Sequence, residues 1–308
     1  MNLGLAGKYT IYKQKVAMKD GIPLLDENGN QVLLGEQEKV AEFENLITNN
    51  GLDLIGKSAA CNYMIVSSDN TIPSITDTTI NILGVTQLDG TGNSNVNKNV
   101  TTAPYWVSYQ RVKRFGAGVG TGNIAKIAIS NNSTGTDLFS IALVKDGNGN
   151  PTTITKLADE ILDVSYELRQ YINTGDTATT ITISGKTHNV TSRIWGLGSW
   201  GANWVNSAAR FAGIGITETN LVGITSSISG AGISFNRDDY EVGSYKSVVR
   251  PDSISVDTGN FATGIHTVFT ARGILYQFGI NPPILKNNTQ TLQLPPITIS
   301  WGRYEGAL

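Results

Sequence analysis

The sequence predicts a mainly β fold, with β-sandwich-like domains, one amphipathic helix packed on a sheet and an N-terminal hairpin arm. Apolar residues recur at every second position in several runs, as at Phe139, Ile141 and Leu143, and this spacing buries one face of a strand. Asn-Gly pairs at 28–29 and 148–149 lie between such runs, and this dipeptide tolerates the positive φ angles of tight hairpins. One segment has helical spacing instead.

Residues 1–35 form the predicted arm. The run LAGKYTIYKQKVAM alternates in part, and IPLLDENGNQVLL places an Asn-Gly pair between two short apolar runs. The motif Asp-x-Asn-Gly-Asn occurs at 26–30 and again at 146–150, which we interpret as one turn used twice, because both copies lack the Gly and Glu of a calcium loop. We expect the arm to reach onto a neighbouring subunit, so that its deletion leaves a folded chain that fails to assemble.

The helical pattern follows in GEQEKVAEFENLITNNGL, residues 35–52. Val40, Phe43 and Ile47 fall on one helical face, and three glutamates lie near the start, where the helix dipole favours negative charge. Asn50-Gly51 is a suitable C-terminal stop. The sequence therefore predicts one helix here, with its apolar stripe against a sheet.

With the strands after it, this helix makes up the predicted domain 36–174. Residues 88–103 are almost wholly small and polar and predict an exposed loop. Residues 115–172 predict a continuous β-meander. The basic residues of QRVKRF, at 110–115, are expected on a solvated face.

A second β-rich domain is predicted over 175–308. TTITISGKTHNVTSRIW has the pattern of a hairpin that turns near Ser184-Gly185. A segment rich in Trp and Gly follows it. Pro295-Pro296 bars the region just before the last run from a central ladder position, so the final strand lies at an edge or begins after the prolines.

Composition excludes several functional classes. Charged residues are 16% of the chain, against roughly 25% in soluble domains. A net charge of −2 disfavours nucleic-acid partners, and Cys61 as the lone cysteine allows no intrachain disulfide or cysteine-based zinc site. The N-terminus lacks the apolar core of a signal peptide, and no run reaches the ~20 apolar residues of a membrane span. We expect no membrane insertion, and assembly in the cytoplasm.

Patterns that would carry chemistry are incomplete. Residues 196–201 match G-x-G-x-x-G, but Trp200 stands where close backbone approach is needed. His188 and His266 lack partners at metal-ligand spacing. The acidic groups at 159–163 and 238–241 could supply the carboxylate pair of a hydrolase, an alternative that sequence alone leaves open. We expect no enzyme activity, no catalytic residue, no metal and no cofactor.

Trp195, Trp200 and Trp204 are the candidate site residues, as interface or glycan contacts, because Trp is enriched at interfaces and stacks on sugars. A packed corner of the core is the alternative for the same three side chains.

Several runs together resemble structural proteins of tailed bacteriophages, in the tail, baseplate or fibre-attachment class. The match is good from about residue 40 to 172 and sparse from 173 to 300; its runs are NLIT at 45–48, GLD at 51–53, TIPSITDT at 71–78, GNIAKIA at 122–128, LFSIALV at 138–144, LDVSYELR at 162–169 and SWGRY at 300–304.

The resemblance implies a non-enzymatic virion subunit in the tail, baseplate or collar region. Such a subunit makes symmetric contacts with copies of itself in a ring or trimer, contacts other tail, collar or fibre proteins, and anchors fibres. A tail protein that recognises host surface glycan through the Trp-rich half is the alternative.

That alternative predicts that the purified protein binds host cells or cell-wall sugar. Changing Trp200 and Trp204 to Ala should then abolish binding, because both stacking surfaces are lost. A pull-down on cell-wall preparations measures this, and binding that survives both changes contradicts the glycan role.

Overall fold

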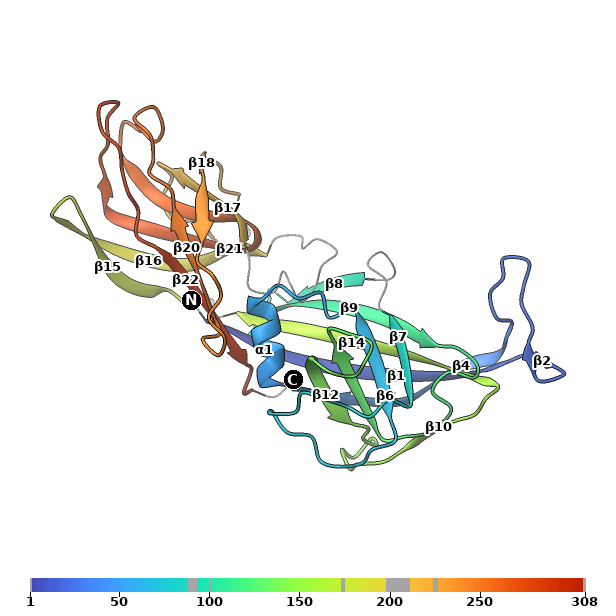
Figure 1. Cartoon of the computed structure of the whole chain (residues 1–308). Coiled ribbons are helices and arrows are strands. Elements are labelled where there is room, and N and C mark those ends of the chain that lie inside the picture. The colour runs from blue at the N-terminus through green and yellow to red at the C-terminus, as the bar shows by residue number, and fades with distance from the viewer. Residues whose placement is uncertain are drawn as a thin grey trace. The chain divides into compact units, whose positions relative to one another are not determined.

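The computed structural model describes residues 2–87, 94–99, 101–172, 175–197, 211–223 and 227–306. Figure 1 shows a mainly β protein with several sheets, and the described residues contain one α-helix. The chain divides into two compact units. The helical unit comprises Gly4–Asn97, Ser108–Gln170 and Arg303–Leu308, and the C-terminal unit comprises Met1–Leu3, Lys98–Val107 and Tyr171–Gly302.

These units interleave in the sequence, which differs from the expected succession of an arm and two domains. The reason is strand length, since five of the described strands contribute residues to both units. These strands are β1 (Asn2–Val16), β8 (Ser94–Asn99), β9 (Trp106–Phe115), β14 (Glu160–Ile172) and β22 (Ile297–Arg303).

The helical unit contains two facing layers. The first holds β1, β14, β9 and β8 in that order, with β4 paired to β1, and the second holds β5-β12-β11-β6-β7. Two short pairs, β2–β3 and β10–β13, complete it. The remaining bounds are β2 (Met18–Lys19), β3 (Ile22–Pro23), β4 (Leu33–Glu44), β5 (Leu46–Ile47), β6 (Tyr63–Ser67), β7 (Gly84–Gln87), β10 (Gly122–Ile124), β11 (Lys126–Ser130), β12 (Leu138–Leu143) and β13 (Ile154–Lys156).

Tyr9 joins the two layers. It is wholly buried, and its ring centroid lies 4.9 Å from that of Tyr166 and 5.8 Å from that of Phe43. Its hydroxyl shares a 3.1 Å hydrogen bond with Ser140 Oγ on β12, and Asn45 Nδ2 donates to the Tyr166 hydroxyl over 2.8 Å. Burial raises the pKa of Tyr9 well above its ordinary value, so this phenol stays neutral and keeps its hydrogen bond.

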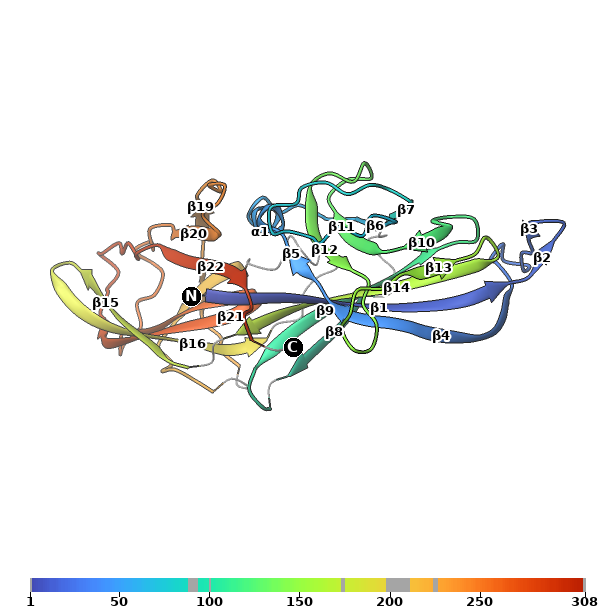
Figure 2. The same ribbon diagram turned by 90° about the horizontal axis from the view of Figure 1, so that it is seen from below.

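The arm expected over residues 1–35 is therefore only partly free. Asn2–Val16 is β1, which lies between β4 and β14 and buries Leu3, Tyr9 and Ile11 completely. The segment from Ala17 to Val32 extends beyond the ends of β1 and β4 (Figure 1 and Figure 2). Deleting all of residues 1–35 would remove a core strand, so the deletion expected to spare folding would instead unfold this unit.

The helix expected over 35–52 was wrong in place. Leu33–Glu44 is β4, paired antiparallel with β1, and the helix α1 spans Asn49–Gly56. In β4, Ala41 and Phe43 are buried while Glu42 and Glu44 are exposed, which is the two-residue period of a strand. The same segment also fits helical spacing, and this is why the sequence predicted a helix here.

Helix α1 begins where the sequence predicted a stop. Thr48 is its N-cap: the side-chain oxygen accepts from the backbone N–H of Gly51 over 2.8 Å and donates to the Leu138 carbonyl over 2.6 Å. The predicted packing of the one helix on a sheet is confirmed. Gly51 lies so close to β12 that an added Cβ would stand 2.0 Å from the Phe139 carbonyl oxygen, which explains the glycine.

The expected meander over 115–172 was wrong in pairing. β11 pairs with β12 as a hairpin, but the far edge of β12 is taken by β5, so the chain after the turn at 146–150 pairs β13 with β10 and then enters the other layer as β14. The pairing therefore depends on which strand occupies the free edge of β12, and a strand distant in the sequence, β5, occupies it.

Two surface expectations also need correction. Ser94–Asn99, inside the expected exposed loop 88–103, is strand β8, because the edge of β9 is open to it. The expected solvated basic face is partly internal, since Arg111 is 3% exposed and Arg114 donates twice to the Asp163 carboxylate over 2.7 Å.

The C-terminal unit is also layered. A five-stranded sheet, β15-β16-β21-β17-β18, lies against β20 and β22, and β19 pairs with β20. The predicted hairpin is confirmed, with Ser184 and Gly185 at positive φ between β15 and β16, and β22 begins directly after Pro295-Pro296. The bounds are β15 (Thr177–Ile183), β16 (Lys186–Leu197), β17 (Phe211–Thr217), β18 (Ala231–Ile233), β19 (Phe235–Arg237), β20 (Lys246–Pro251) and β21 (Ile265–Ile284).

An ion pair in the helical unit predicts acid sensitivity. Lys126 Nζ donates to the Asp69 carboxylate over 2.6 Å, and this bond lowers the pKa of Asp69 from 3.8 to about 2. The pair stabilises the fold above pH 3.8, and this contribution is lost as pH falls toward 2. Asp69→Asn should therefore flatten the stability profile over that range in denaturant unfolding, whereas the exposed control Glu27→Gln should keep the wild-type slope.

Candidate assembly surfaces

Large apolar side chains gather on three neighbouring segments of the helical unit, at 17–34, 116–121 and 157–159. Gln31 Oε1 accepts from the Ala117 N–H over 3.3 Å, and the Gly118 N–H donates to the Ala158 carbonyl over 3.0 Å, so the segments lie side by side. We call their exposed apolar residues the tip patch: Ile22, Leu24, Leu25, Leu34, Val119 and Leu157.

The exposure in this patch is large. Ile22 is 68% exposed and Leu25 is 59% exposed. Single exposed apolar residues are ordinary on protein surfaces, whereas several on neighbouring segments are typical of a surface that contacts another protein. The patch is therefore a candidate interaction surface on the described part of the helical unit.

A turn holds this protruding segment in one conformation. Asp26 Oδ1 accepts from the backbone N–H groups of Asn28 and Asn30 over 2.9 and 2.8 Å, and Gly29 has φ +78°. The hydrogen bond from Asn30 is the main reason that the pKa of Asp26 is lowered. A preorganised loop loses less conformational entropy on binding.

The interpretation of the repeated motif as one turn used twice is confirmed. Asp146 Oδ1 accepts from the Asn148 and Asn150 N–H groups, both over 2.9 Å, and Gly149 has φ +83°. Asp146 is the counterpart of Asp26 in the second copy, and the same pair of hydrogen bonds stabilises both turns.

The same loop is acidic. Between positions 17 and 31 the charged residues are three acidic ones, Asp20, Asp26 and Glu27, and one basic one, Lys19. A partner surface for this loop should therefore combine apolar pockets with positive charge.

Of the predicted tryptophan site, the structure describes one member. Trp195 lies on β16, is half-buried, and meets Phe269 edge-on, with centroids 6.3 Å apart and ring planes at 87°. This residue packs inside the C-terminal unit. Trp200 and Trp204 lie outside the described residues, so the interface or glycan role of the three stays a prediction.

The acidic groups weighed for hydrolysis hold structural bonds. Asp238 accepts two hydrogen bonds of 2.7 Å from Arg250, and Glu160 pairs with Lys13 over 3.2 Å. Both histidines also form hydrogen bonds within the fold. Nδ1 of His188 lies 2.6 Å from the Pro282 carbonyl oxygen, and Nδ1 of His266 lies 2.8 Å from Asn220 Oδ1. Within the described ranges, no three His, Cys, Asp or Glu side chains are placed to hold a metal ion.

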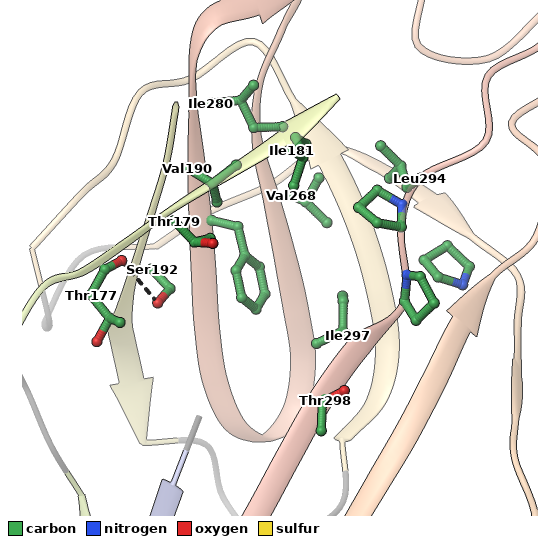
Figure 3. A pocket seen from close by; sticks show the side chains of 14 residues that line it. Thr177, Thr179, Ile181, Val190, Ser192, Val268, Ile280, Leu294, Ile297 and Thr298 are labelled. Carbon is green, nitrogen blue, oxygen red and sulfur yellow. Dashed lines mark hydrogen bonds between the residues drawn. The ribbon is translucent and has the colours of Figure 1, made fainter. Parts of the chain in front are cut away.

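The C-terminal unit contains a groove that sequence reasoning missed. Three adjoining pockets of about 250, 550 and 610 Å³ follow β15, and neighbouring pockets share wall residues. Figure 3 shows the first, with Ile181 and Val190 of the hairpin on one side and Leu294 and Ile297 on the other. One feature of the sequence could have indicated this groove: the two-residue period of a strand places Thr177, Thr179 and Ile181 on the same face of β15.

Comparison of the chain with known protein families, with curated proteins and with solved structures gave no match. In the ranges that the structure covers, no helix has the length and hydropathy needed to cross a bilayer. The surfaces described above are therefore the observations on which a function can be argued.

The tip patch should not contribute to folding. Ile22→Ser and Leu25→Ser should each change the free energy of unfolding by no more than ~0.5 kcal/mol, because their side chains are already in water. Tyr9→Ala should cost ~3–5 kcal/mol, as other large core truncations do. Urea unfolding of the three variants measures this, and a large loss in the tip variants would mean that the patch is packed.

Proposed function

We propose that this protein is a structural subunit of a tailed-bacteriophage virion, in the tail, baseplate or collar region. Its work is to make symmetric contacts with its own copies and with other virion proteins, and it carries out no chemistry. The tip patch is the observation that carries the assembly role, and the phage-like runs between about 40 and 172 support the virion context.

The energetics favour a multi-copy assembly over an isolated pair. Complete burial of Ile22, Leu24 and Leu25 would contribute ~1.5–3 kcal/mol each. Together this is of the same order as the ~4–15 kcal/mol lost on association. A contact through these three side chains alone is therefore weak, and a closed ring or trimer, in which each copy makes two contacts, stabilises it.

The assembly role is tested on the full chain. Light scattering coupled to size exclusion should find oligomers at micromolar concentration. The triple variant Ile22→Ser, Leu24→Ser, Leu25→Ser should be monomeric, because the apolar contact is removed without loss of core. Val242→Ser, which alters a residue 65% exposed in the C-terminal unit, is the matched control and should assemble normally. A wild-type chain that stays monomeric at every concentration contradicts the assembly role.

The virion role needs a separate measurement. Antibodies against the purified protein should label phage particles at the tail or collar in electron micrographs. Labelling confined to unassembled material in the lysate, with particles bare, would contradict it.

A further inference from the structure

The β15 groove has an open strand edge along its length. Within the described residues of its sheet, β15 pairs with β16 alone. Thr177, Thr179 and Ile181 face into the first pocket, opposite Leu294 and the two prolines before β22. That pocket, about 250 Å³, is smaller than the ~300–1,000 Å³ of most small-molecule sites. Its size and apolar walls suit inserted side chains of a protein partner.

The charges of the groove are positive. Lys186, Arg250 and Lys286 are among its lining residues, and no Asp or Glu of the described residues lines any of the three pockets. Arg250 is neutralised by Asp238, and Lys286 donates to Asn260 Oδ1 over 2.8 Å. Lys186 is exposed at the turn of the hairpin and supplies the accessible charge.

We propose that the β15 groove of one copy binds the loop 19–27 of a second copy, an inference that rests on the proposed assembly role. The loop offers what the groove lacks: Ile22, Leu24 and Leu25 as exposed apolar side chains, with carboxylates beside them. The apolar residues enter the pocket between β15 and the prolines, and Asp26 or Glu27 meets Lys186.

This contact is heterologous, because the loop and the groove are different surfaces of the chain. Repeating it joins copies head to tail, and the result is a ring where the rotation closes and a filament where it does not.

Engineered cysteines test the contact directly. The native thiol of Cys61 is buried and has a raised pKa, so introduced thiols react in its place. Full-length Leu24→Cys and Thr179→Cys proteins are mixed and treated with a short bismaleimide. The expected result is a covalent dimer in the mixture and none with either variant alone.

Ile72→Cys mixed with Thr179→Cys is the control, because Ile72 is 86% exposed in another loop of the same unit. It should not cross-link. Equal cross-linking of Ile72 and Leu24 would overturn the assignment of the loop 19–27.

A charge reversal gives an independent readout. Lys186→Glu should weaken self-association about fivefold, of the order seen for exposed ion pairs and their reversal. Adding Glu27→Lys to the same chain should restore it, and sedimentation velocity measures both. Failure of the restoration together with absent cross-links overturns the proposal.

The two proposals fail in different ways. Oligomers that form without the Leu24–Thr179 cross-link leave the assembly role intact and refute the groove as its partner surface. A protein that neither cross-links nor self-associates refutes both.

Discussion

The packing of β1, a strand of the first layer, against the second layer of the helical unit is the constraint on which the other features depend. Tyr9 brings a large ring into the core and uses its hydroxyl to reach Ser140 across the layers, with Tyr166 and Asn45 completing the polar contacts. Buried hydroxyl groups must be satisfied in this way, since an orphaned one costs ~1–3 kcal/mol. The cluster thus sets the spacing and register of the two layers.

Because β1 and β4 are fastened there, the segment between them can extend into solvent as an ordered loop. The turn at Asp26 gives it a defined shape without any help from the core. A folded unit that exposes Ile22 at 68% gains nothing in stability from that side chain. The proposed contact with another molecule would give this side chain a role, since exposed apolar groups otherwise favour aggregation.

The proposed contact between copies pairs two different surfaces of the chain. One is apolar and acidic, the other apolar and basic, and they belong to different compact units. Complementary surfaces on one chain favour head-to-tail association and disfavour face-to-face pairing, because like charges would then oppose each other. Such an interface suits an assembly in which every copy points the same way.

Local chemistry alone determined the mainly β class, both Asp-x-Asn-Gly-Asn turns, the Ser184-Gly185 hairpin and the start of β22 after Pro295-Pro296, because each depends on φ preferences or strand period within a few residues. The apolar character of residues 22–25 was also visible in the sequence. Tertiary structure decided the rest. Glu42 and Phe43 fit a helix as well as a strand, and pairing with β1 makes their segment a strand. The free edge of β12 pairs with β5 and not with the strand that follows β12 in the sequence. The β15 groove exists because two segments distant in the sequence line it. Competition between strand edges is non-local, so no local pattern encodes it.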